Sequence, residues 1–376
     1  MSIRIECVEF VGLRSPLEPP ARFSWGTAEA RNVGLVRIEL DDGTEGWGET
    51  SVTFPLWSLE ERAATVNQGL AMLFKGRICQ SIEDVRDLVT EVDAATTRLR
   101  PLWAPVAISA GIAAIEMALL DALAVRAQVP LWQMLGGEPF DVPLYAVGFT
   151  GSPEQAAVQA QTAIQEGFSA VKVRLGFGMD ADLELLTAFR KTLGSTSTIL
   201  ADVNMGWSVE QALEMLPLLE DFDLGWLEEP VGRMDLAGLA AIGQRTKTPL
   251  AAGENCYSLE EASVLIKARA VNVFMPDIAR LGGLLNSIVA VQRAQGAGLD
   301  YSPHHYASDI GFSAMLTLCA VMGPSQPILR DITPWALRHE VLLEPVALSD
   351  GTARVSNDPG IGPRPNMATI ERYRVL

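Results

Sequence analysis

The sequence contains few cysteines and few histidines for its length of 376 residues. The cysteines are Cys7, Cys79, Cys256 and Cys319. They lie far apart and form no C-x-x-C pair, which excludes a disulfide framework and a thiolate zinc site. With only three histidines, few side chains can carry protons near neutral pH. We expect reduced cysteines and a cytoplasmic protein.

Basic side chains are also scarce. The 29 lysines and arginines are outnumbered by 46 acidic residues, giving a formal net charge of −17. Such a surface repels phosphates, so we expect no nucleic-acid partner and no anionic membrane partner. The chain has no run of 18 consecutive apolar residues, and its start, MSIRIECVEFVGL, lacks the features of a signal peptide. An anionic ligand would therefore require positive charge that is local to its site.

The residues that are present, 48% of them apolar, suit one large barrel and a second, smaller unit. The first part has the alternation of a β-meander. We expect strands at 4–12, 33–40 and 45–49, with a turn at 41–44. Residues 108–129 are rich in Ala and Leu and predict a helix that ends before Pro130.

A different rhythm begins near Val142, where short apolar runs alternate with amphipathic helices. The apolar runs are 142–149, 170–174, 197–202, 224–227, 249–252, 271–275, 299–302 and 327–330. Two helix starts have the pattern of a capping box, beginning at Ser152 and at Ser258. Eight strands alternating with helices predict a parallel sheet that closes into a barrel.

These patterns define the expected fold class and domain boundaries. We predict a modified (β/α)7β TIM-type barrel at 131–344, preceded by an α+β capping domain at 1–130. Residues 345–376 become strand-like again (VALSDGTARV) and are expected to pack back on the capping domain.

Acidic residues end three consecutive predicted strands, at Asp202, Glu228 and Glu254, each 26 residues after the previous one. Side chains at the carboxyl ends of barrel strands converge on one mouth. Three convergent carboxylates cannot all remain ionised without a cation, and oxygen-only ligation suits Mg²⁺. The alternative is that each acid is an ordinary loop or helix-capping residue. The register of all three favours a magnesium site.

The next two strand ends carry Asp277 and His304, 27 residues apart. A carboxylate beside an imidazole fixes its tautomer and makes it a base, although His304 could instead be a structural histidine. Lys172 and Arg174 end an earlier strand and share one face of it. They either balance the carboxylates or neutralise an anionic substrate.

Taken together, the stretches ADVN, WLEEP, AGEN, MPDIARLGG and SPHH, with DDGTEGWGE near the start, resemble the enolase superfamily and its mandelate racemase subgroup. The resemblance covers essentially the whole chain. It implies that Asp202, Glu228 and Glu254 bind Mg²⁺, that Asp277 and His304 form the catalytic dyad, and that capping loops cover the site.

Two positions depart from the family pattern. Where racemases of this group have Lys-x-Lys, this chain has Lys172-Val173-Arg174, and arginine is a poor base. The eighth strand reads Ile328-Leu329-Arg330-Asp331 where the family often has a glutamate, so Arg330 or Asp331 is a candidate replacement. A single base favours dehydration of a sugar acid to a 2-keto-3-deoxy acid. The alternatives are a racemase, epimerase or cycloisomerase of a carboxylate, and a barrel that only binds its ligand.

Substrate contacts are expected from the strand ends and the capping loops. The candidates are Asn204, Asp331, Arg22, Trp25, Phe54 and Trp57. The aromatic ones could equally belong to the core of the small domain. We expect a small carboxylate, such as a sugar acid, as the substrate, and a homo-oligomeric protein.

Overall fold

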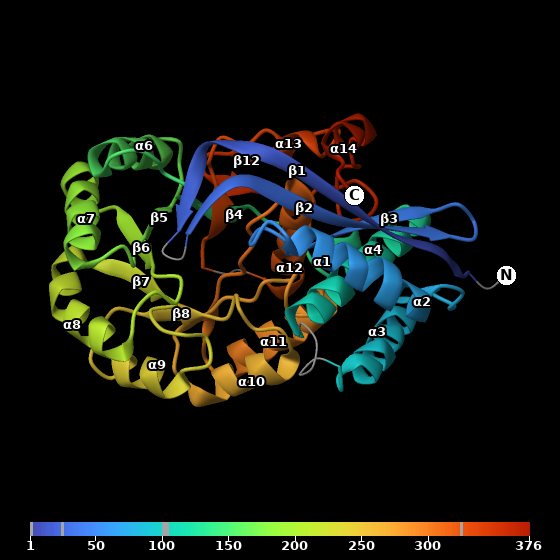
Figure 1. The fold of residues 1–376 in the computed structure, drawn as a ribbon, viewed down its shortest axis with the longest axis horizontal. Coiled ribbons are helices and arrows are strands. Elements are labelled where there is room, and N and C mark those ends of the chain that lie inside the picture. The colour runs from blue at the N-terminus through green and yellow to red at the C-terminus, as the bar shows by residue number, and fades with distance from the viewer. Residues whose placement is uncertain (1–2, 24–25, 100–104, 324–325) are drawn as a thin grey trace.

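The computed structural model describes residues 3–23, 26–99, 105–323 and 326–376 (Figure 1). Three antiparallel strands open the chain, β1 (Ile5–Phe23), β2 (Gly26–Leu40) and β3 (Glu45–Thr50). The predicted turn is present, since Thr44 N donates to Asp42 Oδ1 at 3.0 Å and Leu40 N donates to Thr44 O at 2.9 Å. The first two strands are far longer than predicted. The outer half of β1 contains Pro16, Pro19 and Pro20, which do not suggest a strand, and a register shift lies between Pro16 and Ala21.

The helices of the capping unit follow these strands. They are α1 (Ser58–Ala64), a π-helical turn η1 (Thr65–Leu70), α2 (Ala71–Phe74), α3 (Ile82–Thr96) and α4 (Pro105–Ala127). The predicted helix at 108–129 is thus confirmed. By length and hydropathy α4 could span a membrane, but 94% of its apolar window is buried inside the protein, as in a core helix. It packs on β3 at two glycines, because a Cβ at Gly46 or Gly48 would collide with the α4 backbone.

The barrel consists of eight parallel strands, all at the predicted places. They are β4 (Val142–Val147), β5 (Ala170–Arg174), β6 (Thr198–Asp202), β7 (Leu224–Glu228), β8 (Leu250–Ala252), β9 (Val273–Phe274), β10 (Asp300–Tyr301) and β11 (Ile328–Asp331). Neighbours in the chain pair from β4 to β10, and β11 returns to pair with β4. Gln326 N donates to Tyr301 O at 3.0 Å, linking the seventh strand to the eighth.

Helices lie outside this barrel, as Figure 1 shows. They are α5 (Leu131–Met134), α6 (Pro153–Gln165), α7 (Met179–Leu193), α8 (Val209–Leu219), the 3₁₀ turn η2 (Glu220–Phe222), α9 (Leu236–Gly243), α10 (Leu259–Ala268), α11 (Leu284–Gly296), α12 (Asp309–Met322) and α13 (Leu337–Glu340). The capping box at Ser152 is confirmed. At Ser258 only half of the prediction holds: its side chain accepts from Glu261 N, but the Glu261 carboxylate accepts from Tyr257 N instead.

The C-terminal tail divides between the two units, so the prediction that it packs on the capping unit holds only in part. A short hairpin, β12 (Leu348–Ser349) and β13 (Thr352–Ala353), pairs with the barrel strand β4 and not with the capping unit. The rest of the tail reaches the capping unit, as predicted. Ile361 N donates to Asp121 Oδ1 at 2.7 Å, Arg364 donates to Glu45 O at 3.2 Å, and Leu376 N donates to Gly12 O at 3.2 Å after α14 (Met367–Tyr373). This antiparallel pairing satisfies the backbone hydrogen-bonding groups at the edge of the tail hairpin. An amphipathic sequence pattern does not specify which sheet such an edge joins.

Candidate active site

A cavity of about 510 Å³ lies between the carboxyl ends of the barrel strands and the capping unit. The barrel side is lined by Lys172, Arg174, Asp202, Asn204, Met205, Glu254, Asn255, Tyr257, Arg280, His304, Tyr306 and Leu329. The capping side is lined by Ser51, Thr53, Phe54, Pro55, Trp57, Ser58, Glu61, Arg62, Val106 and Ala107. The residues of both units therefore face the same enclosed space.

Lys172 joins two of the three predicted metal ligands. Its ammonium nitrogen lies 2.9 Å from Asp202 Oδ2, 2.9 Å from Glu228 Oε1 and 3.0 Å from Glu228 Oε2. All three residues are buried. Burial alone would lower the pKa of Lys172, but the charges of Asp202 and Glu228 outweigh it and raise this pKa well above its usual value. Lys172 is therefore an ammonium ion that balances part of the acidic charge.

The acidic charge that remains is not fully balanced by the protein. Burial, followed by the charge of Asp202, raises the pKa of Glu228 well above its usual range. Glu254 differs: burial raises its pKa, but its interactions with His304 and Arg280 outweigh burial and lower it. Glu254 Oε2 is nevertheless buried and accepts no hydrogen bond: it lies 3.1 Å from His304 Nε2, without hydrogen-bond geometry. An all-oxygen donor set with excess negative charge and an unused carboxylate oxygen fits a hard divalent cation.

The three carboxylates do not enclose one point as they stand. Within the described part of the chain, no group of three Asp, Glu, His or Cys side chains is arranged to hold a metal ion. The reason is visible in the contacts: Lys172 occupies the space between Asp202 and Glu228, and Glu254 faces His304. Cation binding would therefore require the carboxylates to turn away from Lys172.

The predicted dyad is present. Asp277 Oδ2 lies 2.8 Å from His304 Nδ1, and an isolated parallel bridge joins the backbones of the two residues. Asp277 Oδ1 accepts from Ala279 N at 2.9 Å. Burial raises the pKa of Asp277, but Arg280 and His304 outweigh it and lower the pKa below its usual value. An ionised Asp277 holds the proton on Nδ1, which leaves Nε2, 3.1 Å from Glu254 Oε2, as the basic nitrogen of this cavity-lining residue.

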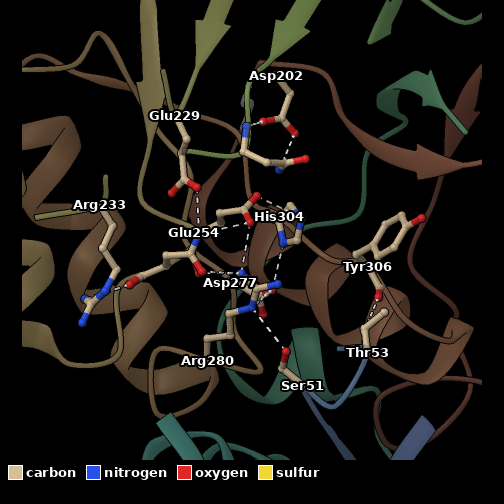
Figure 2. Close-up of polar contacts among 12 residues, drawn as sticks. Ser51, Thr53, Asp202, Glu229, Arg233, Glu254, Asp277, Arg280, His304 and Tyr306 are labelled. Carbon is tan, nitrogen blue, oxygen red and sulfur yellow. Dashed lines mark hydrogen bonds and ion pairs between the residues drawn. The ribbon is translucent and has the colours of Figure 1, made fainter. Parts of the chain in front are cut away.

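Arg280 is a site residue that the sequence reasoning missed. Figure 2 shows the His304 imidazole close to Glu254 and Asp277, with Arg280 reaching toward Ser51. The Arg280 guanidinium lies 3.1 Å from Glu254 Oε1, 3.2 Å from Asp277 Oδ2 and 3.3 Å from Ser51 Oγ. Its signal in the sequence was its place three residues after Asp277, within an acidic cluster that needs cations.

Arg174 interacts with Tyr306 as well as with the carboxylate of Asp202. Its guanidinium carbon lies 5.1 Å from the centre of the Tyr306 ring. Arg31 of β2 approaches the same ring to 4.2 Å and donates a hydrogen bond to the Tyr306 hydroxyl. Tyr306 and Arg31 were not among the predicted site residues, because no local pattern connects positions 275 residues apart.

Asp331 at the eighth strand is already paired. It accepts from Arg31 and Arg338, each at 2.6 Å, and from Thr333 Oγ1 at 2.7 Å. Arg330 turns the other way and pairs with Asp309 at 2.7 Å. Asp331 thus lies beneath the Arg31–Tyr306 contact and is not one of the lining residues, so its role in substrate binding stays a prediction.

The other predicted substrate contacts divide into two groups. Asn204, Phe54 and Trp57 line the cavity, and Asn204 Nδ2 donates to Asp202 Oδ2 at 3.1 Å. The Trp57 side chain is 66% exposed, which places it at the cavity mouth and not in the core of the small domain. The Arg22 side chain and the whole of Trp25 lie outside the residues that the structure describes.

Comparisons with known proteins agree with this geometry. Residues 7–136 match the family described as mandelate racemase / muconate lactonizing enzyme, N-terminal domain, and residues 155–369 match the enolase C-terminal domain-like family. The chain is 30% identical to the L-talarate/galactarate dehydratase of Salmonella typhimurium over 96% of this chain and 88% of that protein. It is 26% identical to the L-Ala-D/L-Glu epimerase of Bacillus subtilis, over 96% of each.

A solved structure shows the same arrangement of both units. The chain superposes on a racemase from Streptomyces coelicolor with bound magnesium at a TM-score of 0.88 and 26% identity, over 99% of this chain and 100% of that chain. The predicted barrel and capping unit are thereby confirmed. Both domain matches and the shared fold show that the chain belongs to the mandelate racemase/muconate lactonizing enzyme family of the enolase superfamily.

Proposed function

We propose that this protein removes the α-proton of a sugar acid and then expels the β-hydroxyl, forming a 2-keto-3-deoxy acid. Its relatives include epimerases, racemases, cycloisomerases and sugar-acid dehydratases, so the family alone leaves the reaction open. The observation that carries the proposal is the single dyad: His304 is held by Asp277 at 2.8 Å, while Arg174 occupies the position of a second base. Loss of a β-hydroxyl requires only one base.

Magnesium belongs to this proposal. The side chains that would hold it are the buried carboxylates of Asp202, Glu228 and Glu254. Asp202 ends β6, Glu228 ends β7, and Glu254 follows β8. When bound, the ion supplies a Lewis acid that stabilises negative charge on the substrate carboxylate. The related racemase that was solved with bound magnesium supports this assignment.

The protein's own residues then divide the work. His304 accepts the α-proton at Nε2, and Asp277 keeps the proton on Nδ1 and stabilises the resulting imidazolium. The ammonium of Lys172 and the guanidinium of Arg174 add positive charge where the enolate charge develops. The capping residues exclude water from the cavity, which strengthens these charge interactions.

An epimerase is the second candidate, because the Bacillus subtilis relative carries that activity at comparable identity. Epimerisation needs a proton carrier on each face of the α-carbon. Lys172 is already bonded to Asp202 and Glu228, and an arginine rarely gives up its proton. These contacts favour dehydration.

The test is to incubate the purified protein with Mg²⁺ and a panel of acid sugars that includes galactarate, L-talarate and arabinonate. Product is measured as keto acid, and α-deuterium incorporation is followed by NMR in D₂O. We expect irreversible keto-acid formation. Deuterium incorporation into both α-epimers, with interconversion and no keto acid, would show that the epimerase alternative is correct.

A further inference from the structure

Tyr306 connects the two sides of the cavity. It follows His304 by two residues in the loop between β10 and α12, and its carbonyl oxygen accepts from Thr53 Oγ1 of the capping unit at 3.0 Å. Figure 2 shows that the Tyr306 side chain points away from His304, with the phenol oxygen at the end that is farther from the imidazole. The ring ends beside Arg174, at the end of a strand that is not adjacent to β10 in the sheet.

Two guanidinium groups flank this phenol. The Arg31 side chain is 1% exposed and lies 4.2 Å from the ring centre, and Arg174 lies at 5.1 Å. Guanidinium groups only donate hydrogen bonds, so the phenol oxygen is the acceptor in its contact with Arg31. Burial lowers the pKa of Arg174, but its charge interaction and hydrogen bond with Tyr306 outweigh burial and raise it. The phenol oxygen is thus positioned where negative charge is stabilised.

The remaining charged neighbours support the same arrangement. Arg338 of α13 also interacts electrostatically with Tyr306, so positive charge near the phenol comes from β2, β5 and α13. Asp331 is the acid of this cluster, and it is bonded to Arg31 and Arg338 at 2.6 Å each. Asp202 also interacts with Arg174, so two carboxylates oppose three guanidinium groups near the phenol oxygen, and one positive charge remains.

We propose that Tyr306 is the catalytic acid that protonates the departing β-hydroxide, on the Arg174 side of the cavity. The inference rests on the proposed dehydration and assigns the second proton transfer to a residue other than His304. A substrate that gives its α-proton to His304, and whose departing β-hydroxide takes a proton from Tyr306, needs no second base. It also gives Arg174 a role, because a guanidinium cannot accept a proton but can stabilise a phenolate.

The proton balance closes without a further reactant. His304 Nε2 takes the α-proton, the α-carbon and β-carbon form a double bond, and the bond from the β-carbon to oxygen breaks. The leaving hydroxide takes the phenolic proton and departs as water. The enol tautomerises to the keto acid, the imidazolium releases its proton to solvent, and the phenolate recovers one from solvent.

The decisive experiment separates the two proton transfers in one enzyme. Tyr306→Phe removes only the hydroxyl, so α-deuterium incorporation by His304 should stay within a few-fold of wild type. Keto-acid formation from the best acid sugar of the panel should fall by about 10²–10⁴-fold, the usual contribution of a general acid. The matched control is Tyr301→Phe on β10, whose hydroxyl donates to Gly323 O at 2.5 Å and which is not a lining residue. We expect both rates to be retained in the control.

Each outcome has a distinct meaning. If the wild-type enzyme exchanges deuterium but releases no keto acid, the proposed dehydration is wrong, and the role of Tyr306 in breaking the carbon–oxygen bond falls with it. If the wild type dehydrates while Tyr306→Phe loses nothing, or loses exchange and product equally, only the role of Tyr306 is refuted.

A second measurement remains informative if Tyr306→Phe does not fold. A fluorinated tyrosine at position 306 keeps the ring, the hydroxyl and the contacts with Arg31 and Arg174, but is a stronger acid. Because a general acid must be protonated to act, the high-pH limb of kcat should move to lower pH with the fluorinated residue. A structural hydroxyl would leave the limb where it is, and that result would overturn the proposal.

Discussion

Replacing Asp277 with asparagine tests the most specific feature of the site, the tautomer of His304. In the wild type, Oδ2 of Asp277 accepts from His304 Nδ1 at 2.8 Å and forms an ion pair with Arg280 Nε at 3.2 Å, while Oδ1 accepts from Ala279 N at 2.9 Å. An asparagine has one acceptor oxygen. If that oxygen stays on Ala279 N, its amide group donates toward Nδ1 and moves the imidazole proton to Nε2.

The magnitude follows from what that proton does. Protonated Nε2 cannot accept the α-proton, so the general-base contribution of about 10²–10⁴-fold in kcat is lost. In free energy this is about 3–5 kcal/mol of transition-state stabilisation. His304→Asn should reduce kcat at least as much. Neither variant removes one of the predicted carboxylate ligands, so Mg²⁺ affinity should change little.

The assay is α-proton exchange in D₂O at saturating substrate, with the fold monitored by circular dichroism. A matched control exists in His339, whose Nδ1 lies 2.9 Å from Asp309 Oδ2 but which is not a lining residue. His339→Asn should keep the wild-type exchange rate. Near wild-type exchange by Asp277→Asn, or an equal loss in His339→Asn, would show that the dyad assignment is wrong.

Three further outcomes follow from buried carboxylates. Glu228→Gln should abolish turnover and weaken Mg²⁺ binding in titration calorimetry, because an amide is a poorer ligand for a hard cation; full activity in chelator would contradict this. Burial raises the pKa of Glu116 in α4 to about 7. The free energy of unfolding of the wild type should therefore fall by about 3 kcal/mol as the pH rises from about 4.5 to about 7. Urea titrations of Glu116→Gln should show no such pH dependence. Burial raises the pKa of Asp331, but the charges of Arg31 and Arg338 outweigh burial and lower this pKa below its usual value. The contribution of Asp331 to stability is therefore present above about pH 4 and is lost as the pH falls. Asp331→Asn should cost about 3–5 kcal/mol near neutral pH in the same assay, and a smaller loss would mean that the buried arginines are compensated elsewhere.

The barrel and its acids could be predicted because their signals are local and periodic. Each apolar run marks one strand, and the residue that ends the run lies at the mouth, as Asp202 and Glu228 do. The parallel order places consecutive strand ends side by side. Asp277 and His304 therefore come together from their spacing alone, and the backbone bridge between them confirms it.

Contacts between distant segments could not be predicted in this way. The long hairpin of β1 and β2 was predicted only at its inner half, because the outer half contains Pro16, Pro19 and Pro20, which interrupt a strand pattern, and takes its pairing from the partner strand. Arg280 and Tyr306 carry no periodic signal, and their roles depend on side chains supplied by the capping unit. The tail hairpin was assigned to the wrong unit for the same reason: an amphipathic strand does not specify which edge it joins.

The capping unit also determines the electrostatics of the site. Glu49 of β3 accepts from Ser308 N at 2.9 Å and from Gly311 N at 2.8 Å, which holds the loop that carries His304 and Tyr306. Arg31 of β2 contacts the phenol of Tyr306, which lies between His304 and Ser308 in the same loop. One loop thus carries the base and the proposed acid, and the capping unit holds its α12 end and the Tyr306 side chain. His304 is held from the barrel by Asp277 at 2.8 Å, so a shift of β2 or β3 would displace Tyr306 more than the base.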